Sequence, residues 1–313
     1  MRWFNGGLEF LKDCLKLEVT DMHSFTGSLE PLRGLKNLRV IVMNNFLGNQ
    51  IERNDNDLNP LSTLRNLQKI YMNSFLGNYP KSLEPLRECQ QLRIIEMGNF
   101  LGDQKNKERI LEPLKGCKEL RIILMDNFKG DYPGSLDPLS ECHQLEEIVM
   151  HGFVGDLNEL MSLSPLGKCL RLQGIYMHSF KGSLEPLKEC QDLRELYMDS
   201  FTGEENRMEG KNGGLEPLKK LKNLQKIGMY SFRGNGKGGL EPLRELEKLK
   251  EIQMKDFDGD LSPLVELKKL EHIETRKFSG NLQTLRKFLE NDDETEVEIK
   301  IQTEEIRLEI KVK

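Results

Sequence analysis

The chain has 313 residues, of which 37% are hydrophobic and 31% charged, and its formal net charge is −5. This balance is typical of a globular protein, and it provides no basic surface to collect phosphates, which argues against a nucleic-acid partner. No stretch reaches the ~18 consecutive apolar residues of a membrane span, and the first residues lack the apolar core of a signal peptide, so we expect neither a membrane protein nor a secreted one.

The first residues, Met1 to Phe4, already fit a pattern that recurs along the whole chain. The sequence therefore begins in the middle of a repeat, without a polar segment to cap the end of a stacked structure. Two explanations stay open. A partner or a second copy covers this end, in end-to-end association through Met1, Trp3 and Phe4, or the chain lacks part of the natural protein.

The repeat is marked by twelve of the fourteen Phe residues. Four of the eleven intervals between them are 21 residues long, and the other seven are 4 to 10 residues longer. The added residues follow Phe-x-Gly and precede the next Leu-x-Pro-Leu. A unit of about 20 residues cannot bury its apolar side alone, so its copies are expected to stack into a solenoid. The repeated residues are Phe4, Phe25, Phe46, Phe75, Phe100, Phe128, Phe153, Phe180, Phe201, Phe232, Phe257 and Phe278.

Each turn is predicted to contain one short helix and one short strand. Leu32, Leu35 and Leu38 lie on one face of a helix. Pro31 stands at its first position, where the missing N–H costs nothing. Alternation such as Ile-Tyr-Met at 70–72 predicts a strand with Ile and Met in the core and Tyr facing outward. Parallel strands of successive turns would lie about 4.8 Å apart in one sheet.

The last residues, 291–313, have a different pattern, in which apolar residues alternate with charged and polar ones. This alternation predicts two amphipathic strands in a hairpin, which would cap the C-terminal end of the solenoid. The apolar residues of the two strands are Val297, Ile299, Ile301, Ile306, Leu308, Ile310 and Val312.

The pattern Leu-x-x-Ile-x-Met-x-x-Phe, as in 38–46, with Leu-x-Pro-Leu-x-x-Leu, as in 29–35, resembles the leucine-rich repeat family over about residues 1–290. The resemblance implies an α/β repeat solenoid, a curved horseshoe with a parallel sheet on its concave face and short helices on its convex face. The C-terminal β-hairpin of residues 291–313 would close it. The family usually places Asn, whose side chain bonds the turning backbone, where this chain has Phe. We expect stacked Phe rings, with the Gly two residues later, to hold the turn instead.

Six Cys residues occupy a position that Leu fills in other turns, and we interpret them as small buried apolar residues. Five stand in consecutive turns, so a disulfide or a soft-metal site stays an alternative, although no Cys-x-x-Cys occurs. Reduced thiols favour a cytoplasmic or other reducing compartment. Eleven of the thirteen Met residues likewise occupy a core position. The cysteines are Cys14, Cys89, Cys117, Cys142, Cys169 and Cys190.

Four consecutive turns have a possible metal ligand at the outward position two residues before Phe. Such neighbours could hold a divalent ion or shift the pKa of a His, but a straight row of ligands is poor tetrahedral geometry, and a polar interaction surface is the simpler interpretation. No nucleophile paired with a base and no phosphate-binding or zinc-protease motif is present. The chain is therefore predicted to be non-enzymatic, with no cofactor and no metal. The four residues are Asp126, His151, His178 and Asp199.

The outward strand positions gather apolar and aromatic residues, Val40 and Ile122 among them, inside a charged border. This arrangement is typical of a protein or peptide interface. The alternative is that such residues only stabilise cross-strand pairs. The border contains Glu195, Glu251, Glu274, Lys69, Lys226, Lys255 and Arg276. The predicted partner-binding residues are Val42, Tyr71, Ile94, Leu124, Val149, Tyr176, His178, Tyr197, Asp199 and Tyr230.

The inserted segments leave the solenoid at one edge and are predicted to border the binding surface, although tolerated surface loops are the alternative. We expect a scaffold that binds a protein or peptide on the concave face and the insertion edge, and that binds neither nucleic acid nor membrane. Two other functions stay open: a structural subunit joined through its N-terminal end, and a regulator that activates or inhibits another enzyme. The longest insertions are Asn49 to Asp57, Asp103 to Ile110 and Glu204 to Gly213.

Overall fold

The computed structural model consists of two compact units, unit 1 (Met1–Phe153) and unit 2 (Val154–Lys313), and each is described by itself. The predicted division at residue 290 into a solenoid and a cap stays a prediction. The structure describes residues 7–25, 27–46, 58–75, 82–101, 110–130, 134–154, 162–201, 214–232, 239–255, 257 and 259–275, and the backbone of 296–302 and 305–311. The segment Met1 to Phe4 and the insertions, apart from Ile110, lie outside these residues.

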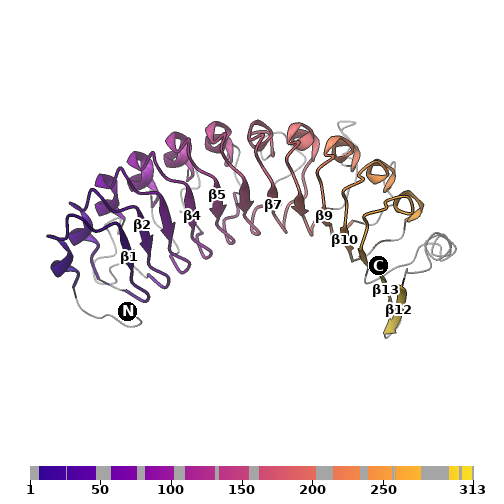
Figure 1. Cartoon of the computed structure of the whole chain (residues 1–313), viewed down its shortest axis with the longest axis horizontal. Helices are drawn as coiled ribbons and strands as arrows, with labels where there is room; N and C mark the ends of the chain where they lie inside the picture. The colour runs from indigo at the N-terminus through magenta and orange to yellow at the C-terminus, as the bar shows by residue number, and fades with distance from the viewer. Residues whose placement is uncertain are drawn as a thin grey trace. The chain divides into compact units, whose positions relative to one another are not determined.

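Unit 1 alternates 3-10 helices with three-residue strands, and each strand pairs in parallel with the next (Figure 1). The helices are η1 (Glu9–Leu11), η2 (Glu30–Leu32), η3 (Asn59–Thr63), η4 (Glu84–Glu88), η5 (Glu112–Gly116) and η6 (Asp137–Glu141). The strands are β1 (Val19–Asp21), β2 (Val40–Val42), β3 (Lys69–Tyr71), β4 (Ile94–Glu96), β5 (Ile122–Leu124) and β6 (Glu147–Val149).

Unit 2 repeats this alternation and ends in a hairpin. The helices are η8 (Leu166–Lys168), η9 (Glu185–Glu189), η10 (Glu216–Lys220), η11 (Glu241–Leu243) and η12 (Ser262–Leu264). The parallel strands are β7 (Gly174–Tyr176), β8 (Glu195–Tyr197), β9 (Lys226–Gly228), β10 (Glu251–Met254) and β11 (His272–Thr275). The hairpin strands are β12 (Glu296–Gln302) and β13 (Glu305–Lys311).

The predicted C-terminal hairpin is present in the backbone. Strand β13 pairs antiparallel with β11, from His272 opposite Lys311 to Thr275 opposite Leu308, and β12 pairs antiparallel with β13. The hairpin therefore continues the sheet of unit 2 in the reverse direction and covers the strand edge of the last parallel turn. Val312 lies outside the described residues.

The short helices predicted from the Leu spacing are 3-10 helices of three to five residues. Most carry Pro at their first or second position, and the amide of Leu32 bonds the carbonyl of Leu29, three residues back, at 2.9 Å. Leu32, Leu35 and Leu38 are all fully buried, as predicted, but only Leu32 lies in η2, which corrects the expectation that one helix holds all three. The amides of Leu35 and Leu38 bond carbonyls three residues back, and such turns of three residues keep the Leu spacing of three on one face toward the core.

The core of each unit is built from the same columns in every turn. The central strand residue, such as Ile41 or Ile70, and the following Met are buried, and the two strand residues beside the central one face outward. The Met column is buried from Met22 to Met254, as predicted. Thr replaces the apolar residue at two of these core positions. Thr20 is the central residue of β1, where most other strands have Ile, and Thr275 in β11 occupies the position of Met in other turns.

Stacked Phe rings, here called the Phe spine, take the place of the usual Asn. Neighbouring rings have centroids 6.2 to 6.5 Å apart and planes within 25°. The following Gly is needed because a Cβ on Gly27 would lie 2.6 Å from the ring of Phe25, and one on Gly130, at φ +53°, would lie 2.5 Å from that of Phe153. The described spine comprises Phe25, Phe46, Phe75, Phe100 and Phe128 in unit 1 and Phe201, Phe232 and Phe257 in unit 2.

Asparagines outside the Phe spine supply hydrogen bonds between turns of unit 1. The side-chain oxygen of Asn44 accepts the amide of Asn73 at 3.1 Å, and that of Asn73 accepts the amide of Gly98 at 3.1 Å. The side-chain amide of Asn127 donates to the Asn99 oxygen at 3.1 Å. In unit 1 the turns are therefore held together by the buried Phe spine and by hydrogen bonds of asparagine side chains nearer the surface.

Candidate partner-binding surface

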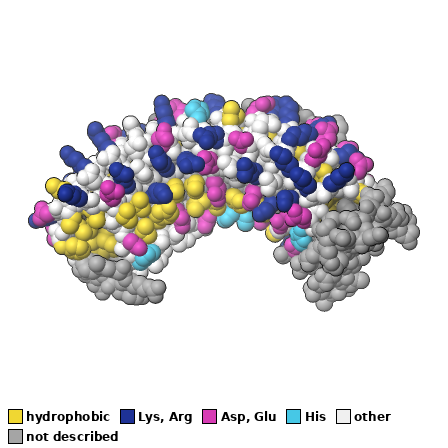
Figure 2. Space-filling model, in the orientation of Figure 1, with side chains coloured by type: hydrophobic (Ala, Val, Ile, Leu, Met, Phe, Trp, Pro, Cys, Tyr) yellow, Lys and Arg dark blue, Asp and Glu magenta, His cyan; other side chains and the backbone are white. Residues whose placement is uncertain are grey.

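The outward side of the strands in unit 1 is mainly apolar. Each outward residue stands beside a buried central strand residue, and its own side chain points away from the core and is at least partly exposed. Val19 is 54% exposed. Figure 2 shows hydrophobic side chains gathered in a band along the strand side of this unit. We call this set the apolar strip: Val19, Val40, Val42, Tyr71, Ile94, Ile122, Leu124 and Val149.

The strand register decides which members of the apolar strip are neighbours. Val42 lies opposite Tyr71, and Leu124 lies opposite Val149. Between these pairs stands Glu96, which accepts a 2.6 Å hydrogen bond from the Asn73 side chain. Burial, and then the charge of Glu96, raise the pKa of Tyr71. The strip is thus apolar with two polar interruptions, Glu96 in this column and Lys69 between Val40 and Ile94 in the other.

The outward side of unit 2 has a different composition, centred on two tyrosines. The rings of Tyr176 and Tyr197 are stacked, with centroids 5.3 Å apart and planes within 7°. The hydroxyl of Tyr176 donates to Glu195 Oε2 at 2.7 Å, and the hydroxyl of Tyr230 donates to Gln253 Oε1 at 2.7 Å. Polar groups of the next strand therefore fix Tyr176 and Tyr230, and ring stacking on Tyr176 orients Tyr197.

Charged groups surround these tyrosines. Lys226 Nζ lies 3.3 Å from Glu195 Oε1, and His178 Nδ1 lies 3.2 Å from Asp199 Oδ2. Burial, and then the negative charges of Glu251, Glu195 and Asp199 together with Tyr230, raise the pKa of Tyr197 to about 12. The predicted residues of unit 2 thus form one cluster, with Tyr230 beside the stacked pair.

The possible metal ligands form His–carboxylate pairs within each unit. His151 Nε2 lies 3.9 Å from Asp126 Oδ1 in unit 1, and His178 pairs with Asp199 in unit 2. Among the described residues, no group of three or more His, Cys, Asp and Glu could hold a metal ion. Within the same part of the chain, no helix is long and apolar enough to cross a bilayer.

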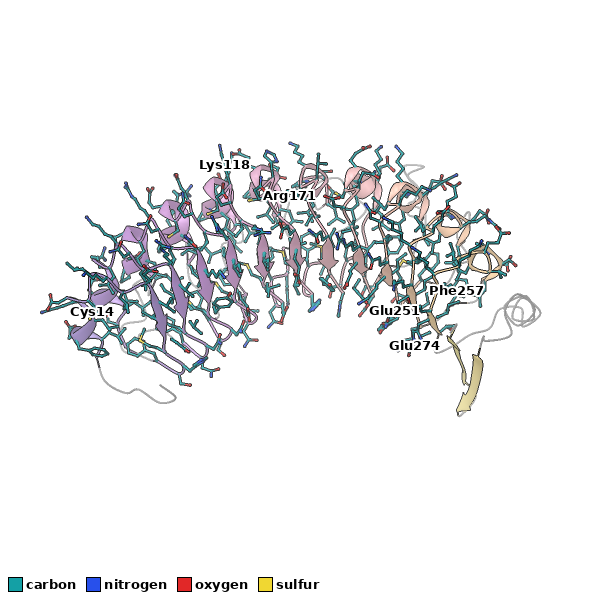
Figure 3. All side chains as sticks on the ribbon, in the orientation of Figure 1. Cys14, Lys118, Arg171, Glu251, Phe257 and Glu274 are labelled. Carbon is teal, nitrogen blue, oxygen red and sulfur yellow. The ribbon has the colours of Figure 1, made fainter. Side chains whose placement is uncertain are left out.

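All six cysteines are free, so the disulfide alternative is wrong in this structure. Five are buried as predicted. The thiol of Cys89 lies 3.6 Å from the Leu61 oxygen of the preceding turn, and that of Cys169 lies 3.9 Å from the Pro165 oxygen of its own turn. Burial raises the pKa of Cys89 and Cys117 to about 12. Cys14 is exposed, which corrects the expectation that all six are core residues. It lies in the first described turn, where no earlier described turn packs over it (Figure 3).

Three surface residues were missed by sequence reasoning. Val19 belongs to the apolar strip and could have been found, because it occupies the same column as Val40. Gly228 and Gln253 shape the tyrosine cluster, although neither is aromatic or charged. The only sequence signal for Gly228 is the missing side chain at a position where most other turns have one.

Comparisons with known proteins match the fold. No family model matches the chain, and no curated protein matches its sequence. An internalin (inlF) of Listeria monocytogenes is 14% identical with a TM-score of 0.57, over 88% of this chain and 86% of that one. The functional domain of InlJ from the same organism, which includes a cysteine ladder, is 12% identical with a TM-score of 0.52, over 86% of this chain and 55% of that one.

A plant protein shares the same architecture. The LRR ectodomain of the receptor kinase GASSHO1/SCHENGEN3 from Arabidopsis thaliana, in complex with CASPARIAN STRIP INTEGRITY FACTOR 2, is 19% identical with a TM-score of 0.51. The match covers 90% of this chain and 38% of the ectodomain. The chain therefore has the leucine-rich-repeat fold that the sequence predicted.

Proposed function

We propose that this leucine-rich-repeat chain is a non-enzymatic recognition module that binds a protein or peptide on the outward side of its strands. The observation that supports the proposal most is the apolar strip of unit 1. Its members, such as Val42, Ile94 and Leu124, are partly exposed although the columns beside them are fully buried. A contiguous exposed apolar surface is costly in water and usually marks an interaction site.

Cross-strand stabilisation alone accounts for the strip less well. The strands are held by buried Ile, Leu and Met columns and by backbone pairing, so stability does not require apolar residues outside. Polar residues stand at equivalent positions, for example Lys69 and Glu96. The plant ectodomain, whose structure contains a bound partner, supports a binding function by analogy of fold. The reducing compartment that the sequence favours stays part of this proposal.

A charge placed inside the apolar strip tests this proposal. Random peptides displayed on phage are selected on the immobilised chain, and affinities of the selected peptides are measured for Leu124→Glu. The matched control is Leu170→Glu, because Leu170 is a 55% exposed leucine after η8, where the equivalent residue of another turn is Glu247. Far-UV circular dichroism checks that both variants fold.

We expect the selected peptides to lose at least about tenfold in affinity for Leu124→Glu, because the carboxylate must be desolvated in the interface, and to keep their affinity for Leu170→Glu. Peptides that bind all three proteins equally would place binding away from the strip. Equal losses in both variants would show a general effect of added negative charge, and would also overturn the proposal.

A further inference from the structure

The tyrosine cluster of unit 2 contains a carboxylate, Glu251, that forms no ion pair with any described residue. In one column the register aligns Glu195, Lys226 and Glu251 on three adjacent strands. Lys226 lies 3.3 Å from Glu195, and His272 follows Glu251 in the register. Among the described residues Glu251 makes no ion pair. Its partly exposed side chain lies on the strand side of the unit (Figure 3).

Glu251 is held in a defined orientation by two neighbours. The Gln253 side-chain amide donates to Glu251 Oε1 at 2.5 Å, and the Gln253 oxygen accepts the Tyr230 hydroxyl at 2.7 Å. These hydrogen bonds use one oxygen of the carboxylate. The second oxygen, Oε2, accepts no hydrogen bond from a described residue.

The ring of Tyr197 lies over the backbone of Gly228. A Cβ at Gly228 would lie 2.4 Å from Tyr197 Cδ1, so only Gly permits this placement, and Tyr176 stacks on the ring. Burial and the charge of Glu251 raise the pKa of Tyr197, which agrees with a hydroxyl close to that carboxylate. The Tyr197 hydroxyl makes no hydrogen bond with any described residue, and its oxygen is a further acceptor.

The described part of this surface carries more negative than positive charge. Among the described residues, the outward positions of β8 to β11 and the positions after them include four carboxylates, Glu195, Asp199, Glu251 and Glu274, and two ammonium groups, Lys226 and Lys255. One ammonium group is already paired with Glu195. A partner group that binds here gains most if it is cationic and carries several N–H donors, because it meets several acceptors on adjacent strands.

We propose that the cluster of Tyr197, Tyr230, Gln253 and Glu251 binds the guanidinium of an arginine side chain of the protein or peptide partner. A guanidinium has five N–H donors in one plane, matches the Glu251 carboxylate oxygen and the Tyr197 phenol oxygen, and packs favourably against aromatic groups. A lysine ammonium would match the charge but presents a more strongly hydrated point charge and no plane to lie against a ring. This inference rests on the proposed function and names one residue type of the partner.

The experiment uses the full chain and the same phage-displayed random peptides. They are selected separately on the native chain, on Glu251→Gln and on Glu247→Gln. The last is a matched control, since Glu247 is an exposed glutamate after η11 whose replacement removes the same charge from the same unit. A selected peptide is then synthesised with Arg and with the neutral isostere citrulline, and its affinity for each protein is measured.

We expect Arg to be enriched at one peptide position on the native chain and on Glu247→Gln, and not on Glu251→Gln. The change from Arg to citrulline should weaken binding to the native chain about tenfold, as expected for a charge-assisted hydrogen bond, and weaken binding to Glu251→Gln less than about twofold. Gly228→Ala should weaken the Arg peptide as well, because the added Cβ displaces the Tyr197 ring.

Three results would overturn the inference. Enrichment of Lys in place of Arg would show a cation site without guanidinium selectivity. Peptides that lose affinity for Leu124→Glu but bind native chain and Glu251→Gln equally would retain the proposed function and remove the arginine site. If no selected peptide loses affinity for Leu124→Glu or for Glu251→Gln, both the proposed function and the arginine site are wrong.

Discussion

Replacing Phe100 separates ring stacking from simple burial in the Phe spine. Phe100 is fully buried, and its ring centroid lies 6.5 Å from that of Phe75 and 6.4 Å from that of Phe128. Leucine keeps most of the apolar contact but removes both ring pairs, each worth about 0.5–1.5 kcal/mol. We therefore expect Phe100→Leu to lower the free energy of unfolding by about 2 kcal/mol.

Asparagine, the residue that leucine-rich repeats usually place here, is expected to cost more. It removes the ring, and core Phe→Ala changes cost about 3–5 kcal/mol. It also buries an amide between two phenyl rings, which adds a desolvation cost unless backbone groups bond it. We expect Phe100→Asn to lower the free energy of unfolding by at least about 4 kcal/mol.

Two measurements report the effect. Urea unfolding followed by far-UV circular dichroism gives the loss of stability, and hydrogen exchange gives local opening, which is needed because stacked repeats need not unfold in one step. The informative amides are those of Asn99, bonded to the Asn73 oxygen at 3.0 Å, and Phe100, bonded to the Met97 oxygen at 2.8 Å. The control Phe10→Leu changes a side chain that is 55% exposed, with an expected effect within about 0.5 kcal/mol.

A stable asparagine variant would refute the reasoning. If Phe100→Asn unfolds at the same urea concentration as the native chain, the inserted amide finds backbone partners as it does in other leucine-rich repeats. Ring stacking would then be replaceable at this position, and the Phe spine could not be what holds the turn. A large loss in Phe10→Leu would instead show that the measured cost is not specific to the spine.

Three further predictions concern buried polar groups and thiols. Thr275→Val should raise the melting temperature, because it removes a buried hydroxyl that has no partner among the described residues and so raises the free energy of unfolding by about 1 kcal/mol. An unchanged or lower melting temperature would contradict this. With a thiol-reactive dye, Cys14 should react at once in the native chain and the other five cysteines only after unfolding. Burial raises the pKa of Cys89, Cys117 and Cys169 to about 12, so these thiols keep their protons in the folded chain at a pH where the unfolded chain loses them. The free energy of unfolding should therefore fall as pH rises from about 9 to 12. Urea midpoints at pH 8 and pH 10.5 test this, and equal midpoints would refute it.

The repeat made the fold predictable because each column has one environment. The periodic Phe residues predicted a ring stack, and Ile and Met at strand spacing predicted which side chains are buried. The helix type was not predictable, since a Leu spacing of three fits a turn of α-helix as well as a 3-10 helix. Burial could not be predicted from the repeat position alone at Cys14. It is exposed because it lies in the first described turn, although the equivalent cysteines of later turns are buried.

The candidate surface was predictable in composition but not in detail. Alternation placed Tyr71, Tyr176 and Tyr197 on the outward side, where the structure has them. It could not predict that Tyr197 lies over Gly228, because this contact joins residues 31 positions apart and depends on ring rotation. The orientation of Glu251 depends in turn on Gln253 and Tyr230, two side chains whose partners the sequence pattern does not specify.

The strand register is indifferent to the amount of chain between turns. Ile175 pairs with Leu196, 21 positions later, and Leu196 pairs with Ile227, 31 positions later, in the same parallel register. An extra ten residues between two turns therefore leaves the strand register unchanged. The point in each turn after Phe-x-Gly is thus a position at which loops of different length and sequence can be grafted, so that binding can be diversified without redesigning the core.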